Sequence, residues 1–222
     1  MLKDEQRRCF VGHSTAFQTW FGTSGTWAQL CDAAYTNTPW VELHGAKQRK
    51  TLWCVSEGCL CKYKYGGVTA QPAKYPSWLS QIEPVVMYFC GLNDPALWPN
   101  SCNLNLYEQG QIIRPHADDE HLFNGRNEDT RVISLSLGCT ATFDVIANVA
   151  IGGKRVIEKA ITLREGDLCT MEAMTQKHYQ HQVLNSAGKA DPGTMTNGRR
   201  INISWRWIKN HQPACKKSRR SS

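Results

Sequence analysis

The sequence contains no run of apolar residues that approaches the ~18 needed for a membrane-spanning helix. Its first ten residues, MLKDEQRRCF, are charged where a secretory signal peptide would need an apolar core. Internal repeats and flexible linkers are also missing, so the 222 residues are most simply one domain. These absences predict an intracellular protein with no membrane partner. In that setting, we expect the ten cysteines to be reduced thiols rather than disulfides.

Acidic residues are scarce relative to basic ones, since 19 Asp and Glu stand against 26 Lys and Arg and leave a net charge of +7. A basic balance favours polyanions, of which nucleic acid is the commonest inside cells. Part of the excess lies between residues 44 and 64, interleaved with Trp53 and Tyr63. Cations for phosphates and rings for bases suit a single-strand platform, although a solvated loop over packed aromatics has the same composition. Within the basic tail, 210–222, we expect the run from Lys216 to Arg220 to be disordered, with a nuclear address or a phosphate-binding arm as the alternatives.

The element pattern predicts an α+β protein that is mostly β after residue 85. Apolar residues at helical spacing indicate helices over 14–35 and 76–89. Residues 41–65 are expected to form short strands and a flap that ends at Gly66-Gly67, and Gly152-Gly153 a hairpin turn. Alternating polar and apolar residues predict further strands at 103–107, 111–115, 131–137, 142–146, 156–163, 168–171 and 201–207. So many short strands favour a sandwich or a jelly-roll barrel.

Two histidines and an aspartate form the first candidate site. His116 and Asp118 stand two residues apart, so at a strand or strand end their side chains project to the same side. His181 would have to come from another strand. Two neutral imidazoles and one carboxylate can hold one face of Fe(II) and leave the opposite face open to a co-substrate and O2.

A strand near the C-terminus predicts an anion site. Residues 200–206, RINISWR, alternate so that one face carries Arg200, Asn202, Ser204 and Arg206. Two arginines on a core strand are costly unless an anion neutralises them, and a dicarboxylate offers each a bidentate partner. A strand with one solvated polar face is the alternative. Asn105 and Tyr107, again two residues apart, are neutral donors that also suit a carboxylate.

Three cysteines close together, Cys54, Cys59 and Cys61, raise the possibility of zinc binding. Their C-x4-C-x-C spacing is not that of a standard zinc knuckle, and no fourth ligand is obvious nearby. Buried or surface thiols without a metal are therefore the alternative.

Taken in order, these motifs resemble the AlkB family of Fe(II)/2-oxoglutarate dioxygenases. The resemblance runs from about residue 41 to residue 208. Its HADDE form and the lid-like stretch QRKTLW…YKYGG are most similar to the eukaryotic nucleic-acid repair branch and its viral relatives. The matching elements are, in chain order, Asn105-x-Tyr107, His116-x-Asp118-Asp119-Glu120, Ser134-Leu135-Ser136-Leu137-Gly138, Arg164-Glu165-Gly166-Asp167-Leu168, His181, and Arg200-x-Asn202-x-Ser204-x-Arg206.

The resemblance implies a double-stranded β-helix, or jelly-roll, core with flanking N-terminal helices. It divides the chain into an N-terminal helical extension (1–40), a dioxygenase domain (41–209) that includes a nucleotide-recognition lid at about 41–70, and the basic tail. Iron would be ligated by His116, Asp118 and His181, with His178 and His121 as competitors for the role. The implied ligands of 2-oxoglutarate are Asn105, Tyr107, Arg200, Asn202, Ser204 and Arg206.

The same resemblance implies substrate contacts. Asp119 would lie at the substrate base and Glu120 would support that edge. The aromatic side chains of Tyr63 and Tyr65 would face or stack on the base. The backbone phosphates would be met by Arg49 and Lys50.

The implied activity is oxidative N-demethylation of bases such as 1-methyladenine and 3-methylcytosine in DNA or RNA, with release of formaldehyde and no catalytic residue beyond the metal ligands. A dioxygenase acting on protein or a small molecule, and a non-catalytic nucleic-acid-binding relative, are the alternatives. Duplex-repair members insert a bulky apolar finger into the base stack, whereas Leu43-His44-Gly45 has a histidine at that place. We therefore expect a preference for single-stranded substrates. We also expect the protein to be a monomer.

Overall fold

The computed structural model describes residues 1–15, 17, 26–42, 49–148, 155–185, 198–213 and 215. Three predictions lie outside the described residues: the histidine at the wedge position 44, the turn at Gly152-Gly153, and the basic run from Lys216 to Arg220. Within the described part, the helices are too short or too polar to cross a membrane.

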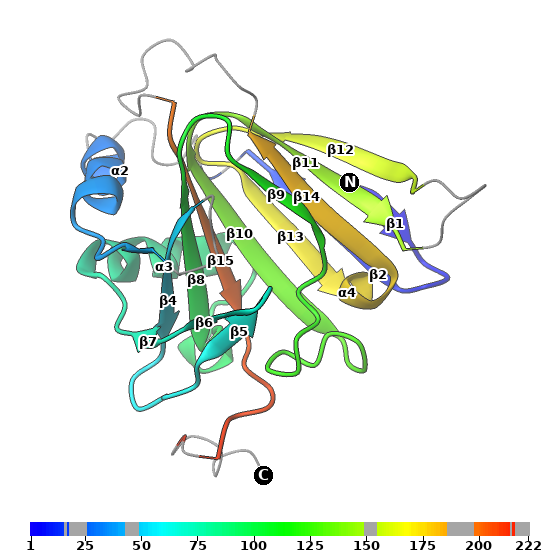
Figure 1. The fold of residues 1–222 in the computed structure, drawn as a ribbon, viewed down its shortest axis with the longest axis horizontal. Coiled ribbons are helices and arrows are strands. Elements are labelled where there is room, and N and C mark those ends of the chain that lie inside the picture. The colour runs from blue at the N-terminus through cyan, green and yellow to red at the C-terminus, as the bar shows by residue number, and fades with distance from the viewer. Residues whose placement is uncertain are drawn as a thin grey trace.

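Two β-sheets face each other and build the jelly-roll core (Figure 1). The large sheet follows the order β1-β2-β13-β10-β15-β8-β4-β3, with β7 paired to β4, and the small sheet follows β12-β11-β14-β9. The strands are β1 (Leu2–Asp4), β2 (Cys9–Ser14), β3 (Val41–Glu42), β4 (Lys50–Val55), β5 (Tyr63–Tyr65), β6 (Val68–Ala70), β7 (Pro72–Ala73), β8 (Ser101–Tyr107), β9 (Ile112–His116), β10 (Thr130–Gly138), β11 (Ala141–Ala147), β12 (Ile157–Leu163), β13 (Leu168–Ala173), β14 (Tyr179–Asn185) and β15 (Arg200–Arg206). This confirms the predicted α+β jelly-roll.

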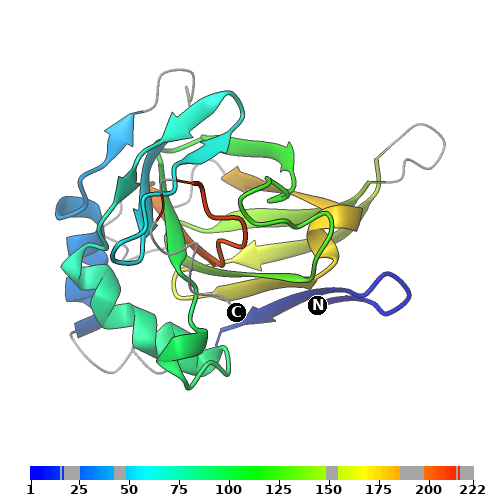
Figure 2. The same cartoon turned by 90° about the horizontal axis from the view of Figure 1, so that it is seen from below.

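The helices are α2 (Thr26–Thr36), α3 (Ser77–Phe89), the 3-10 turn η1 (Pro95–Leu97) and the short α4 (Thr175–His178). Of these, α2 and α3 cover the outer face of the large sheet, whereas α4 connects β13 to β14. Side chains from α2 and α3 pack with alternate residues of β8, β10 and β15 into the main core, and Figure 2 shows both helices on one flank of the molecule. On β15 the core residues are Ile201, Ile203 and Trp205. Because strand side chains alternate, the polar residues between them face the small sheet.

The N-terminal extension differs from the helical prediction at its start. Residues 2–4 and 9–14 form β1 and β2, and β2 pairs with β13 from Cys9 opposite Ala173 to Ser14 opposite Leu168. The strand partner lies about 160 residues away in the chain, so no local pattern revealed it. Within the expected helix at 14–35, the structure describes α2 from Thr26 onward.

The flap predicted to end at Gly66-Gly67 continues past these residues, which form the turn of a separate hairpin, β5–β6, at the open end of the core (Figure 1). Gly66 and Gly67 join the strands with φ of +51° and +82°, and two successive positive φ values suit a tight type I′ hairpin turn. The hairpin therefore has a fixed register, Tyr63 opposite Ala70 and Tyr65 opposite Val68.

Candidate active site

A cavity of about 1510 Å³ opens between the two sheets, and the β5–β6 hairpin forms one of its walls. Its lining includes the predicted iron ligands, part of the predicted 2-oxoglutarate set and the base-contact residues Asp119, Glu120 and Tyr65. The fold has thus gathered residues spread over more than 150 positions around one space.

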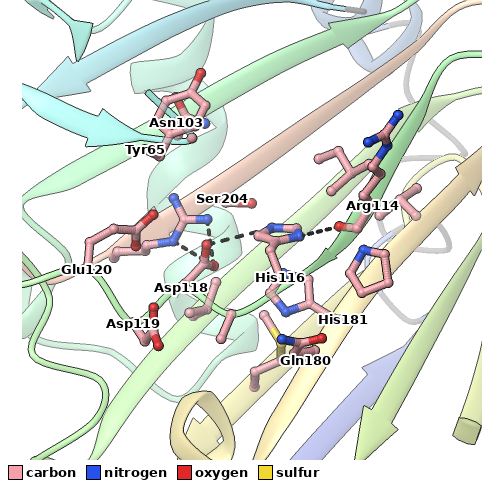
Figure 3. A pocket seen from close by; sticks show the side chains of 18 of the residues that line it. Tyr65, Asn103, Arg114, His116, Asp118, Asp119, Glu120, Gln180, His181 and Ser204 are labelled. Carbon is pink, nitrogen blue, oxygen red and sulfur yellow. Dashed lines mark hydrogen bonds and ion pairs between the residues drawn. The ribbon is translucent and has the colours of Figure 1, made fainter. Parts of the chain in front are cut away.

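Pairing within the small sheet brings the two histidines together. β9 and β14 place His116 directly opposite His181, with ring centroids 4.2 Å apart. Asp118 stands two residues beyond the end of β9, and its Oδ1 lies 4.0 Å from His116 Nε2. Figure 3 shows the three side chains pointing toward one another, and their ligand atoms all lie within 4.8 Å. The competing histidines are elsewhere, since His178 ends α4 and His121 is exposed, and neither belongs to the described lining of the cavity.

Neighbouring groups orient these three side chains. The Nδ1 atom of His116 lies 2.9 Å from the carbonyl oxygen of Arg114, so a neutral ring that donates there turns its Nε2 lone pair to the site. Arg206 donates from Nε (2.9 Å) and Nη2 (2.6 Å) to Oδ2 of Asp118 and leaves Oδ1 facing His116. The backbone N–H of Asp118 donates to the side-chain oxygen of Gln176 on α4, at 2.8 Å.

The protonation states suit a divalent cation. Burial, followed by the charge on His116, lowers the pKa of His181 to about 3, and burial also lowers the pKa of His116. Burial alone would raise the pKa of Asp118, but Arg206 and the two imidazoles bring it to about 2. At neutral pH the site therefore offers two neutral imidazoles and one carboxylate, the donor set that Fe(II) accepts.

The large sheet presents a polar strip to the cavity, at the predicted anion site. Register places Arg200 opposite Tyr107 and Asn202 opposite Asn105. On the other side of β15, β10 adds two serines, opposite Asn202 and Ser204. The strip consists of Asn103, Asn105 and Tyr107 from β8, Ser134 and Ser136 from β10, and Arg200, Asn202, Ser204 and Arg206 from β15. Asn103 was missed in the sequence, although its place two residues before Asn105 on one strand face could have indicated it.

Several buried donors of this strip lack protein partners. The Nη2 of Arg200 donates to Ser136 Oγ (2.9 Å) and Asn202 Oδ1 (3.1 Å). Its Nε and Nη1, the Tyr107 hydroxyl and the Arg206 Nη1 have no hydrogen-bond partner within the described part of the chain. Burying a charge in this way is costly unless a ligand completes it. A dicarboxylate supplies the missing acceptors, so the residues present fit 2-oxoglutarate.

The two ligand sets meet at Arg206, which belongs to the strip and also holds Asp118. Arg200 and Tyr107 are fully buried and do not line the open cavity, whereas Asn202, Ser204 and Arg206 do. A co-substrate that reaches Arg200 must therefore displace the side chains that cover it. An iron ion at the histidines and a carboxylate at the strip would be neighbours.

The two predicted phosphate contacts lie in different places. Arg49 turns inward, where its Nε donates to Asn105 Oδ1 at 3.0 Å and its guanidinium lies 5.4 Å from the ring centre of Tyr65. Arg49 therefore lines the cavity beside the co-substrate strip, and it does not lie at the surface where the predicted phosphate contact would be. Lys50 stays outside the cavity lining, half-exposed, with Nζ 3.5 Å from Glu42.

The predicted base contacts line the cavity near the iron ligands. Tyr63 is buried between Trp53 and Tyr65, with ring centres 4.8 and 4.6 Å away, and its hydroxyl donates to Glu120 Oε1 at 3.0 Å. Tyr65 is the more accessible ring. Burial and the nearby Asp118 raise the pKa of Glu120 to about 7.

Asp119 is paired in a way that the sequence did not indicate. Its carboxylate forms an ion pair with Arg126, whose side chain is 72% exposed while that of Asp119 is 24% exposed. Both residues line the cavity. Figure 3 shows Asp119 and Glu120 on the same side of Asp118.

Comparison with known proteins agrees with this geometry. Residues 12–206 match the model of the 2OG-Fe(II) oxygenase superfamily. By sequence, the chain is 29% identical over 150 residues to an alpha-ketoglutarate-dependent dioxygenase AlkB homolog of Caulobacter vibrioides, which covers 65% of this chain. The match spans 60% of that relative's length.

Two solved structures share the fold. One is that of OsALKBH1, with a TM-score of 0.57 and 18% identity over 88% of this chain and 97% of that one. The other is an oxidoreductase of the 2OG-Fe(II) oxygenase family from Burkholderia pseudomallei, with a TM-score of 0.52 and 11% identity over 90% of this chain and 86% of that one. With its motifs, its fold and these relatives in agreement, the chain belongs to the 2OG-Fe(II) oxygenase superfamily, as an AlkB-like member.

Proposed function

We propose that the protein is an Fe(II)- and 2-oxoglutarate-dependent dioxygenase that removes N-methyl groups from bases in single-stranded DNA or RNA. The observation that carries this proposal is the shared cavity. It joins the His116, Asp118 and His181 cluster to the polar strip on one side and to an acidic, aromatic wall on the other. When bound, Fe(II) with 2-oxoglutarate and O2 supplies the oxidising power that hydroxylates a methyl group, whose hydroxymethyl product loses formaldehyde.

The protein's part is to hold the reactants in place. Arg200 and Arg206 neutralise the carboxylates of the co-substrate, and Arg206 also keeps Asp118 ionised and oriented. His181 stays neutral because it is buried, and the partial burial of His116 lowers the pKa of that imidazole as well. The hairpin that carries Tyr65 lies over the cavity, where it can exclude water from an extruded base.

Charge favours a cationic base as the substrate. A methyl group at N1 of adenine or N3 of cytosine gives the ring a fixed positive charge. Asp119 and Glu120 lie beside the iron ligands and can complement that charge. In this structure Asp119 forms its ion pair with Arg126. Because the Arg126 side chain is largely exposed, a cationic base can replace it as the partner of Asp119 at little cost in free energy. Neutral methylated bases lack this attraction.

The sequence around His44 supports single-stranded substrates, because an apolar wedge is missing and unstacking a paired base costs a few kcal/mol. We expect higher kcat/KM on a single-stranded oligonucleotide with one 1-methyladenine or 3-methylcytosine than on the same strand annealed. Salt is held fixed because phosphate contacts are salt-sensitive. Equal or higher kcat/KM on the duplex would contradict this preference.

The decisive experiment loads the protein with Fe(II) anaerobically, adds 2-oxoglutarate and O2, and follows a panel of methylated oligonucleotides by mass. Loss of a methyl group with stoichiometric formaldehyde is the expected result, and Asp118→Ala is the inactive control. Conversion of 2-oxoglutarate to succinate without demethylation of any oligonucleotide would leave a dioxygenase but reject nucleic acid as its substrate.

A further inference from the structure

A second cluster of metal-ligand side chains lies at the base of the β5–β6 hairpin, apart from the iron ligands. Cys59, Cys61, His211 and Cys215 each offer one ligand atom, and all four atoms lie within 4.8 Å of one another. The three cysteines are buried and His211 is half-buried. The sequence prediction grouped Cys54 with the first two, but Cys54 belongs to the main core and contacts the carbonyl of Lys74 instead.

The spacing of the ligand atoms matches tetrahedral zinc. His211 Nδ1 lies 3.2 Å from Cys215 Sγ, 3.5 Å from Cys61 Sγ and 3.9 Å from Cys59 Sγ, and the Cys59 and Cys215 sulfurs are 3.5 Å apart. Zn–S bonds of about 2.3 Å and Zn–N bonds of about 2.0 Å at tetrahedral angles give edges of about 3.8 Å between sulfurs and about 3.5 Å from nitrogen to sulfur. A Cys₃His set with no fifth position is the form of structural zinc sites.

The surrounding backbone is built around these ligands. The N–H of Gln212 points at Cys61 Sγ at 3.3 Å, a contact that favours a thiolate. The Gln212 side chain pairs with both backbone groups of Lys62, accepting at 3.0 Å and donating at 2.9 Å. Trp53 Nε1 donates to the carbonyl of Cys61 at 2.8 Å. These bonds hold the two halves of the cluster, about 150 residues apart in sequence, in register.

A disulfide and the simple packing of thiols both fit the cluster less well than zinc does. A Cys59–Cys215 disulfide needs sulfurs about 2.0 Å apart, well below the 3.5 Å found. Plain packing of thiols accounts for burial but not for a half-buried imidazole nitrogen that faces three sulfurs.

We propose that Cys59, Cys61, His211 and Cys215 form a structural zinc site that fixes the base-recognition hairpin to the end of the co-substrate strand. Cys61 stands two residues before Tyr63, and His211 stands five residues after Arg206. The same small core contains Cys59, Cys61, Cys215, Trp53 and Tyr63. Zinc would thus hold in place the support of Tyr65 and of the Tyr63–Glu120 hydrogen bond.

The first test uses cobalt as a spectroscopic substitute for zinc. The full chain carries His181→Ala, which removes one iron ligand, and is titrated anaerobically with Co²⁺ after reduction. We expect one equivalent of tetrahedral cobalt with thiolate-to-metal charge-transfer absorption, displaced by one equivalent of Zn²⁺. Cys61→Ser and Cys215→Ser, each in this background, should lose the absorption, while the matched control Cys54→Ala, a buried cysteine five residues from Cys59, should keep it.

The outcomes that overturn the proposal are distinct. Absence of the charge-transfer band in the protein without cysteine changes would reject the site, and so would a band that survives in Cys61→Ser and Cys215→Ser. Detection of a Cys59–Cys215 disulfide in zinc-free protein isolated under reducing conditions would do the same. None of these results depends on demethylase activity.

The second test measures hydrogen exchange in the zinc-loaded His181→Ala protein before and after chelation. Amides of 59–70 should exchange at least several-fold faster once zinc is removed, while amides of the remote β11–β12 pair stay unchanged. Equal protection of 59–70 with and without zinc would reject the proposed link to the hairpin.

Discussion

The Arg200→Met substitution tests whether Arg200 serves to bind 2-oxoglutarate or to stabilise the fold. Arg200 is fully buried, and two of its guanidinium nitrogens, Nε and Nη1, have no partner among the described residues. We expect the substitution to weaken 2-oxoglutarate binding strongly, because it leaves a carboxylate of the co-substrate unpaired in a dry site. The same change should cost the co-substrate-free protein little, since methionine removes a buried charge that the protein satisfies only in part.

The magnitude follows from the contacts. Removing one partner of a buried ion pair costs about 3 kcal/mol or more, which raises the Kd for 2-oxoglutarate roughly 150-fold. The free protein loses the two hydrogen bonds from Nη2 to Ser136 and Asn202, and the contact of the guanidinium with the Tyr107 ring, whose centre is 5.8 Å away. Asn202 Oδ1 still accepts from Ser134 at 2.8 Å, so we expect the free energy of unfolding to fall by about 1 kcal/mol or less.

Calorimetric titration with 2-oxoglutarate, with Mn(II) in place of Fe(II) to prevent turnover, measures the first quantity, and urea unfolding without co-substrate measures the second. Arg199→Met is the matched control. Arg199 is the preceding residue, but its guanidinium lies 4.8 Å from the ring centre of Tyr35, away from the strip. An unchanged Kd in Arg200→Met, or an equal loss in Arg199→Met, would refute the assignment of the strip to 2-oxoglutarate. Arg200→Lys should restore binding only in part if the contact is bidentate.

Three further predictions address the metal centre. Alanine at any one of the three proposed iron ligands should abolish turnover of 2-oxoglutarate, whereas His178→Ala should keep measurable turnover, and the reverse pattern would reassign the ligand. Gly125→Ala should weaken Mn(II) binding by about 1–3 kcal/mol, because an added Cβ would lie 3.0 Å from the Asp118 carbonyl oxygen and from Gln176 Cβ. An unchanged Kd for Mn(II) would show that the loop adjusts without moving Asp118. The metal-free protein should lose stability as pH falls from 6.5, the ordinary pKa of histidine, toward 3, because unfolded His181 binds a proton in that window and folded His181, with its pKa of about 3, does not. His181→Gln should flatten this slope in urea titrations across pH 4–7, and identical slopes would contradict the buried neutral imidazole.

Much of the fold could be predicted because strand alternation is a local property. On β15, apolar residues at 201, 203 and 205 and polar residues between them indicated one core face and one ligand face, and the structure has both. Gly66-Gly67 was predicted only as the end of the flap, whereas in the structure the pair forms the turn between β5 and β6, because few other residues accept two successive positive φ values. The pair His116-x-Asp118 was likewise predicted from the side-chain period of a strand, although β9 ends at His116 and bonds from Arg206 and Gln176 hold Asp118 in place.

The pairing of segments that are far apart in the chain could not be predicted from the sequence. The N-terminal strand β2 exists because β13 offers it an edge, and nothing between residues 9 and 14 predicts that edge. The family resemblance assigned Arg49 to phosphates, but the register of β4 against β8 starts at Lys50 opposite Leu106 and leaves Arg49 beside Asn105. The ion pair between Arg126 and Asp119 depends on the conformation of the loop that joins them, and no sequence pattern predicts that conformation.

The cysteines show most clearly what the sequence determined and what the tertiary structure determined. By itself, the sequence showed that Cys59 and Cys61 stand close enough to bind one metal ion, and that no fourth ligand was obvious nearby. Only the tertiary structure brought His211 and Cys215 to them, across about 150 residues, and removed Cys54 to the core. The physical reason is that chemical type and local spacing are written in the order of residues, whereas distances between remote segments are set by how the two sheets and the hairpin pack.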